Sequence, residues 1–167
     1  MIHNASAVYH KGYTLIELLV VITIGIIIFS AGFAGYREFS RRQLLSGITK
    51  QIKTDLRTAQ QLALTGQKPQ GATCSRLVSY DFDRINSFTY QIIAVCTNGP
   101  TTTKSVSLPT GITFTSAAAV GTDISDPISF KVLGLGTNLE SNVTLTVSFS
   151  STTNSETIVI GKGGDIK

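Results

Sequence analysis

The segment Gly12-Tyr13-Thr14-Leu15-Ile16-Glu17 leads directly into the uncharged run Leu18–Tyr36, and this stretch decides the fold. At about 1.5 Å rise per residue, a helix over the run nearly matches the roughly 30 Å hydrocarbon core of a bilayer. A carboxylate at membrane depth is costly and needs a positively charged partner. The run contains no such partner. We therefore expect Glu17 to pair with the amine created when a neighbouring copy of the chain is cut after Gly12.

Residues 11–22 resemble the processing site of type IV prepilins and type II secretion pseudopilins. In that family a membrane peptidase cuts after the glycine and methylates the new N-terminal residue. A conserved glutamate then neutralises the amine of an adjacent subunit during filament assembly. The resemblance implies that residues 1–12 are a cleaved leader, that Tyr13 is the methylated terminus and that Glu17 guides assembly. Two residues depart from the family pattern: Tyr13 replaces the usual Phe, and Ala34 lies near where many type IV pilins have Pro.

A signal peptide or an ordinary membrane anchor is the simpler interpretation of an apolar N-terminal segment. Three features oppose it. The apolar run starts directly after the expected cleavage site, is too long for a typical signal-peptide core, and lacks a small-residue exit site followed by a polar start. A simple anchor would also leave Glu17 unexplained.

The distribution of positive charge conflicts with the expected orientation. Only Lys11 and the initiator amine precede the apolar run, whereas Arg37, Arg41 and Arg42 follow it, which by the positive-inside rule would place the C-terminal side in the cytoplasm. The processing motif implies the reverse, because the peptidase site of this family faces the cytoplasm. We therefore expect a single-pass protein of the bacterial inner membrane with its head outside the cytoplasm, associated with a filament after assembly. The implied partners are other pilin or pseudopilin subunits, the prepilin peptidase and the inner-membrane assembly platform.

Helical periodicity continues beyond the apolar run, with no proline between Tyr13 and Lys68. Apolar residues recur every three or four positions and predict an amphipathic second half: Leu44, Leu45, Ile48, Ile52, Leu56, Ala59, Leu62 and Ala63. Gly66 and Pro69 then supply a stop signal. The sequence predicts one helix over 13–66, transmembrane to about residue 36. Residues 37–66 carry the net positive charge, whereas basic and acidic residues balance over 67–167.

Beyond Pro69 the apolar period changes to two, which predicts strands. The expected strands are Ser75–Phe82, Phe88–Cys96, Lys104–Leu108, Ile112–Thr115, Ile128–Leu133, Val143–Ser150 and Thr157–Gly161, with a turn over 83–87. The predicted class is α+β: a long N-terminal helix packed on an antiparallel β-sheet head that spans residues 67–167, as in pilins.

The two cysteines fit the first predicted hairpin. Cys74 and Cys96 are symmetric about Ile85, the centre of the expected turn, so pairing in that register places them opposite each other within disulfide range. An extracytoplasmic head favours oxidation. The alternative is two free cysteines in the core.

Catalysis is not expected. His3 and His10 lie in the predicted leader, so the mature chain has no imidazole for a Ser-His-Asp or Cys-His arrangement or for a histidine-containing metal site. Asp81 and Asp83 could begin a calcium site, but turn chemistry explains them better. We predict no enzyme activity, no metal and no cofactor.

The C-terminal third resembles the heads of H-type minor pseudopilins and fimbrial T-type minor pilins through Ile128–Lys131, Val143–Phe149, Thr157–Gly161 and the tail Gly163–Lys167. The resemblance implies a structural minor subunit of a type IV pilus or a type II secretion pseudopilus. The alternative is a DNA-binding minor pilin for DNA uptake. Two features argue against nucleic acid as a partner: basic and acidic residues balance in the head, and the tail has no Arg.

Overall fold

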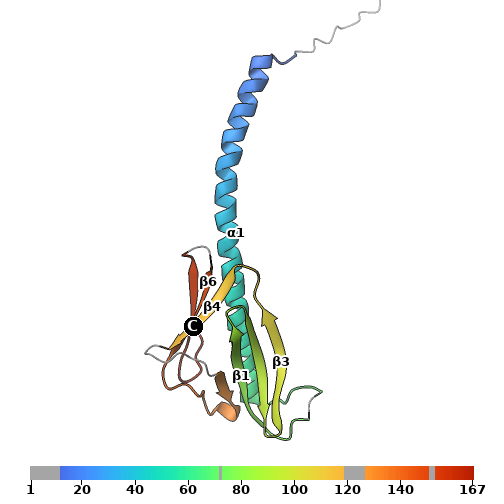
Figure 1. Ribbon diagram of the computed structural model, residues 1–167, viewed down its shortest axis with the longest axis vertical. Helices are drawn as coiled ribbons and strands as arrows, with labels where there is room; N and C mark the ends of the chain where they lie inside the picture. Colours follow the sequence, from blue (N-terminus) through green and yellow to red (C-terminus); the bar gives the residue numbers. More distant parts are fainter. Residues whose placement is uncertain (1–11, 72, 119–126, 151–152) are drawn as a thin grey trace, which may run out of the picture. The chain divides into compact units, whose positions relative to one another are not determined.

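The computed structural model describes residues 12–71, 73–118, 127–150 and 153–167 (Figure 1). By their contacts the residues form two compact units, Met1–Arg41 and Arg42–Lys167. Helix α1, Leu15–Thr65, contributes to both units. Each unit is described by itself.

The first unit consists, where described, of a short extended start and the first part of α1. Its large apolar side chains are solvent-exposed, among them Leu15, Ile16, Leu18, Val21, Ile27 and Phe29. The helix is long and apolar enough to cross a membrane, and none of its most apolar stretch is buried in the structure. Such a surface is stable only in lipid or against other apolar helices.

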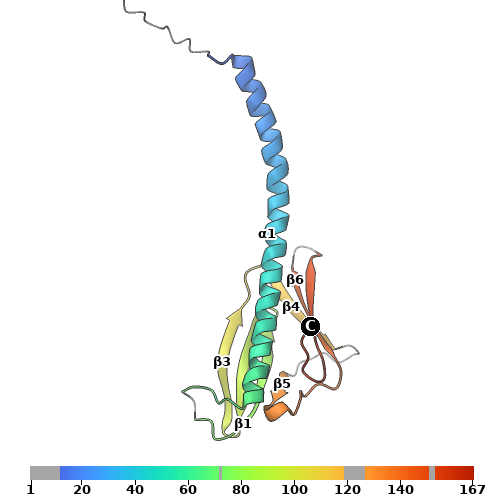
Figure 2. The ribbon, with the colours of Figure 1, turned by 180° about the vertical axis from the view of Figure 1, so that it is seen from behind.

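The second unit buries one face of α1 beneath the sheets (Figure 2). The predicted stripe is confirmed at Leu45, Ile48, Ile52, Leu56, Ala59 and Ala63, which are buried, whereas Leu44 is 44% exposed. The helix ends as predicted at a glycine. Gly66 adopts φ +65°, and the N–H of Gln67 donates to the carbonyl of Leu62 at 3.1 Å, which closes the last turn.

In the described part of the chain, seven strands and one short 3₁₀ helix follow. They are β1 Leu77–Asn86, β2 Thr89–Cys96, β3 Gly99–Ser107, β4 Ile112–Ala118, β5 Ile128–Lys131, η1 Val132–Gly134, β6 Val143–Phe149 and β7 Ser155–Ile160. The strands form two sheets with antiparallel neighbours, one in the order β3-β2-β1-β5 and one in the order β4-β6-β7. The sequence predicted an antiparallel head but not its division into two sheets.

The buried aromatic residues join the two sheets and the helix in one core. Tyr80 and Phe82 of β1, Tyr90 of β2, Phe114 of β4 and Phe130 of β5 are all nearly inaccessible. The rings of Phe82 and Tyr90 stack at 4.9 Å, and Phe114 meets Tyr90 edge-on at 5.9 Å. These contacts fix the strand alternation, because a one-residue slip would turn the aromatic set outward.

The predicted turn over 83–87 is wrong. Strand β1 continues to Asn86, and only Ser87 and Phe88 separate it from β2. The side chain of Asn86 stabilises this tight connection, because its Oδ1 accepts a hydrogen bond from the N–H of Phe88 at 2.8 Å. The polar residues Asp83 and Arg84 are therefore strand residues, opposite Gln91 and Tyr90.

Candidate processing and assembly site

The expected cleavage site lies in non-helical chain just ahead of the helix. Gly12, Tyr13 and Thr14 are exposed and non-helical, and α1 begins at Leu15. The Thr14 hydroxyl accepts a hydrogen bond from the N–H of Glu17 at 3.3 Å, and the Thr14 carbonyl accepts one from the N–H of Leu18 at 3.2 Å. Thr14 is therefore the N-cap. The sequence carries the Thr-x-x-Glu pattern of a capping box here, a signal that was not among the predictions.

Gly12 has no structural role that this chain reveals. A Cβ added at Gly12 would meet nothing within 4 Å, and its backbone is outside the left-handed region that favours glycine. The same empty surroundings hold at Gly25, Gly32 and Gly35 on the apolar part of α1. Any requirement for glycine at these four positions must therefore come from another molecule.

Glu17 lies in the first turn of α1, among exposed apolar neighbours such as Ile16 and Leu18. The positive end of the helix dipole favours a carboxylate there. Among the residues that the structure describes, no cation lies within ion-pair distance of Glu17. This carboxylate therefore lies one helical turn after the expected N-terminus, on an exposed helix surface that is otherwise apolar.

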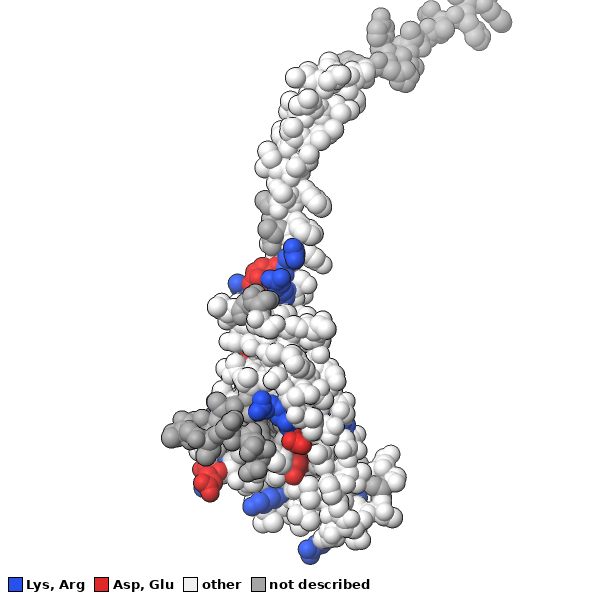
Figure 3. Space-filling view, in the orientation of Figure 1, with Lys and Arg blue, Asp and Glu red and all other residues white. Residues whose placement is uncertain are grey.

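The apolar stretch is followed by charged side chains. Figure 3 shows an uncharged surface along the visible part of α1, then a group of blue and red side chains. The guanidinium of Arg37 lies 5.9 Å from the centre of the Phe33 ring, a cation–π contact between residues one helical turn apart. Charges and aromatic rings in this position are typical of a membrane interface.

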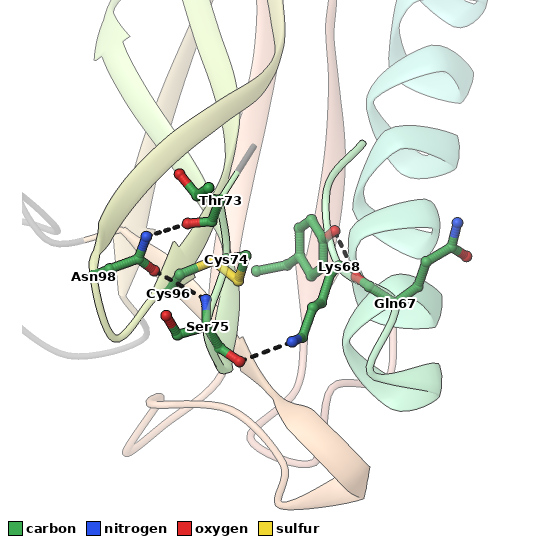
Figure 4. The surroundings of a disulfide bond; sticks show 8 residues. Gln67, Lys68, Thr73, Cys74, Ser75, Cys96 and Asn98 are labelled. Carbon is green, nitrogen blue, oxygen red and sulfur yellow. Dashed lines mark hydrogen bonds between the residues drawn. A yellow bond between two sulfur atoms is a disulfide. The ribbon is translucent and has the colours of Figure 1, made fainter. Parts of the chain in front are cut away.

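Cys74 and Cys96 form a disulfide bond, with their Cα atoms 5.5 Å apart (Figure 4). The predicted pair is confirmed, but the predicted register is wrong. Cys96 pairs in the ladder with Leu77, and Cys74 precedes β1. The short segment between Cys74 and β1 is bonded to the residue that follows β2: the N–H of Thr97 donates to the carbonyl of Arg76 at 3.0 Å.

Asn98 forms hydrogen bonds to both neighbours of Cys74, residues 73 and 75 (Figure 4). Its Oδ1 accepts from the N–H of Ser75 at 3.2 Å, and its Nδ2 donates to the carbonyl of Thr73. Lys68 also donates to the carbonyl of Ser75, at 2.8 Å, and so ties the segment to the chain that leaves α1. The disulfide therefore closes a compact junction between helix, strand β1 and the turn after β2.

A polar cluster between α1 and the first sheet was not predicted. Asp55 is 6% exposed, and its Oδ2 accepts from the Tyr90 hydroxyl at 2.7 Å while its Oδ1 accepts from Lys104 Nζ at 2.6 Å. Burial, and then the bond to Asp55, raises the pKa of Tyr90 well above its ordinary value. The sequence held one signal, because Asp55 occupies a position of the apolar stripe, three residues after Ile52 and four before Ala59. Its partners on β2 and β3 could not be found from the periodic pattern.

The C-terminal tail is bound to the head. Lys167 exchanges two backbone hydrogen bonds with Val159 of β7, and its Nζ lies 3.5 Å from Asp165. Gln60 and Arg57 of α1 donate to carbonyls of the tail. The tail thus closes the second sheet, as the resemblance implied, and the cation of Lys167 has an anionic neighbour.

Comparison with known proteins agrees with both resemblances. The prokaryotic N-terminal methylation motif matches residues 9–33. The structure is similar to that of the minor pseudopilin EpsH from the type 2 secretion system of Vibrio cholerae, with a TM-score of 0.54, 7% sequence identity and coverage of 74% of this chain and 94% of that chain. A search of curated sequences finds no significant match. The chain thus carries the prokaryotic N-terminal methylation motif at the start of a pseudopilin-like fold.

Proposed function

We propose that this protein is a structural minor subunit of a type IV pilus or a type II secretion pseudopilus. Its leader, residues 1–12, is removed by the prepilin peptidase, Tyr13 is N-methylated, and α1 then enters the filament from the inner membrane. The head remains outside the cytoplasm. The observation that carries the proposal is Glu17, the carboxylate in the first turn of a helix whose most apolar stretch is fully exposed.

Processing at Gly12 is supported by the local geometry. The peptide bond between Gly12 and Tyr13 precedes the N-cap Thr14, so it lies in exposed, non-helical chain that a peptidase can reach without unwinding α1. Nothing in the chain itself requires a glycine at position 12. A protease pocket that accepts only a small residue explains this glycine.

Assembly through Glu17 follows from electrostatics in an apolar filament core. A buried carboxylate without a partner is strongly unfavourable, whereas a carboxylate paired with an ammonium group is tolerated. Within the described residues Glu17 lacks such a pair. The methylated amine of Tyr13 in an adjacent subunit supplies the missing charge. Assembly with other pilin-type subunits, on the inner-membrane platform, completes the site.

DNA uptake is the alternative, and no observation favours it. Basic and acidic residues balance over 67–167, and the tail is bonded to β7 and α1. Non-specific DNA binding requires several unpaired cations on one surface. The structural role is therefore preferred.

The test is Glu17→Gln in cells that carry the assembly machinery. The variant keeps the size and hydrogen-bonding capacity of the side chain but removes its charge, so we expect normal cleavage and membrane insertion. Recruitment to other pilin-type subunits, measured by crosslinking at matched membrane levels, should be lost. Asp81→Asn on the head is a control with the same chemical change. Equal recruitment of the Gln variant and wild type would contradict assembly through Glu17 and favour a simple anchor.

A further inference from the structure

One end of the first sheet carries an exposed apolar groove. Leu133 and Leu135 are 77% and 71% exposed, and with Val78 they border a groove of about 510 Å³. Arg76 and Lys131 supply the basic residues of its lining. Large side chains this exposed, grouped beside a groove, are typical of a surface that binds a partner.

The backbone of this end is strained in a way that the fold does not require. Leu133 adopts φ +56°, a left-handed conformation that is unfavourable for a bulky residue. Because the side chain is exposed, it gains little from packing in return. Gly134 and Gly136 beside it also have positive φ, and the carbonyl of Gly136 accepts from the N–H of Lys131 at 2.9 Å. The segment is thus a tight, fixed tip that presents two leucines. Such strain is often retained where it serves binding.

The opposite end of the same sheet carries a complementary tip. Ile85 and Phe88, at the β1–β2 turn, are each 51% exposed. The turn is rigid, because the carbonyl of Phe88 accepts from the N–H of Leu108 at 2.7 Å and that of Ser87 accepts from the N–H of Phe114 at 3.0 Å. An apolar tip that is already ordered loses little conformational entropy when it binds.

The charges beside the two ends are also complementary. Asp83 lies opposite Gln91 and belongs to the face of β1 that points away from the core, as does Asp81. Arg84 belongs to the other face, opposite the buried Tyr90, and its Nε is buried. The outward charge next to the hairpin tip is therefore negative. At the groove, Asp81 accepts a hydrogen bond from the lining residue Ser79, and Arg76 and Lys131 leave an excess of positive charge.

We propose that the groove formed by Val78, Leu133 and Leu135 binds the Ile85–Phe88 hairpin tip of a second copy of this chain. Asp83 of the second copy then faces Lys131. Val78 and Ile85 lie near opposite ends of β1, about 23 Å apart at roughly 3.3 Å per residue. A reciprocal exchange would require antiparallel heads, whereas parallel helices make the heads point the same way. The contact is therefore heterologous: one copy supplies the groove and its neighbour supplies the tip. This proposal rests on the proposed function, in which the helices of neighbouring subunits are also parallel.

The test uses the full-length protein in cells with the assembly machinery and a photo-crosslinking phenylalanine analogue at Leu133. We expect a crosslinked homodimer. After reduction and trypsin digestion, the partner peptide should be the one that spans residues 85–104. The analogue at Leu135 should give the same product if the first variant does not accumulate. The analogue at Leu44, exposed on α1, is the control and should not capture this peptide.

Charge exchange provides a second measurement. Asp83→Lys should lower the crosslink yield about tenfold or more, because it places like charges together, and Lys131→Asp in the same chain should restore it. Glu156→Lys on β7 makes the same charge change away from both surfaces and should leave the yield unchanged.

Several results would overturn the inference. These are no homodimer from either position, a crosslink to a different protein, or a partner peptide other than 85–104. If Glu17-dependent recruitment and a Tyr13 terminus persist in those samples, the proposed function stands and only the head contact is wrong. Loss of both would contradict the proposed function as well.

Discussion

The buried carboxylate of Asp55 should be a main determinant of how firmly α1 is held on the first sheet. It accepts hydrogen bonds from Tyr90 and Lys104, which lie on two different strands. In Asp55→Asn the carboxamide keeps one acceptor oxygen, and its NH₂ group faces the second donor. We expect the carboxamide oxygen to keep the hydrogen bond from Tyr90, whose side chain is fully buried. Lys104 then loses its bond, because its partly exposed side chain can turn toward water.

The magnitude follows from the exposure of the two partners. The Lys104 side chain is 46% exposed and that of Asp55 is 8% exposed, so solvent screens the ion pair from one side. Breaking a fully buried pair costs about 3–5 kcal/mol, whereas an exposed pair contributes at most about 1 kcal/mol. For Asp55→Asn we expect a loss of about 2 kcal/mol in the free energy of unfolding, because a charge-assisted hydrogen bond is also lost. For Lys104→Met we expect about 1 kcal/mol.

The assay is equilibrium urea unfolding of a fragment 42–167, the second compact unit, with its disulfide intact. Asp81→Asn is the matched control. Its carboxylate lies on the outward face of β1 and accepts a hydrogen bond from Ser79, so the change should stay within about 0.5 kcal/mol. If Asp55→Asn were no more destabilising than Asp81→Asn, the reasoning from burial would be refuted.

The same cluster predicts a dependence on alkaline pH. The fragment contains two tyrosines, Tyr80 and Tyr90, and burial raises the pKa of both above the ordinary value of about 10. A raised pKa means that the folded state keeps a proton that the unfolded state loses. Stability is therefore present below pH 10 and falls above it, by at most about 1.4 kcal/mol per pH unit for one tyrosine. In a Lys104→Met background, Tyr90→Phe should reduce this slope. An unchanged slope would contradict the assignment.

Three further predictions concern processing, the disulfide and the strained tip. Gly12→Val should leave the leader attached, as intact mass of the membrane-extracted protein will show, without loss of the folded head, because the added side chain meets nothing within 4 Å; a mature terminus other than Tyr13 in the wild type would contradict the site. Replacing Cys74 and Cys96 by Ser should lower the melting temperature of the fragment 42–167 by an amount that corresponds to roughly 3 kcal/mol, and exported wild-type protein should contain no alkylatable thiol. Leu133→Asn should raise the stability of that fragment by up to about 1 kcal/mol, because Asn tolerates a positive φ and the leucine is exposed; a loss of stability would show that Leu133 packs on the head.

Local pattern predicted the elements that local physics determines. The uncharged run, the stripe from Leu45 to Ala63 and the stop at Gly66 are properties of one helix, and the structure confirms them. The predicted strand Lys104–Leu108 began too late, because Gly99 and Pro100 are residues that usually interrupt strands. They are the first residues of β3, an edge strand, where proline is tolerated because one side of the strand needs no ladder partner. The division into two sheets depends on contacts between distant strands, which periodicity does not encode.

The disulfide shows how a correct pair can rest on an incorrect register. Symmetry about Ile85 placed Cys74 opposite Cys96. The turn is instead at Ser87 and Phe88, and β1 has extra residues at Ile85 and Val78, so the ladder pairs Cys96 with Leu77. The bond forms because Val78 is an extra residue in β1 and Asn98 pins the segment before the strand. Hairpin symmetry therefore restricted the partners of each cysteine but could not determine the backbone path between them. That path depended on one amide side chain, and only the three-dimensional arrangement showed its role.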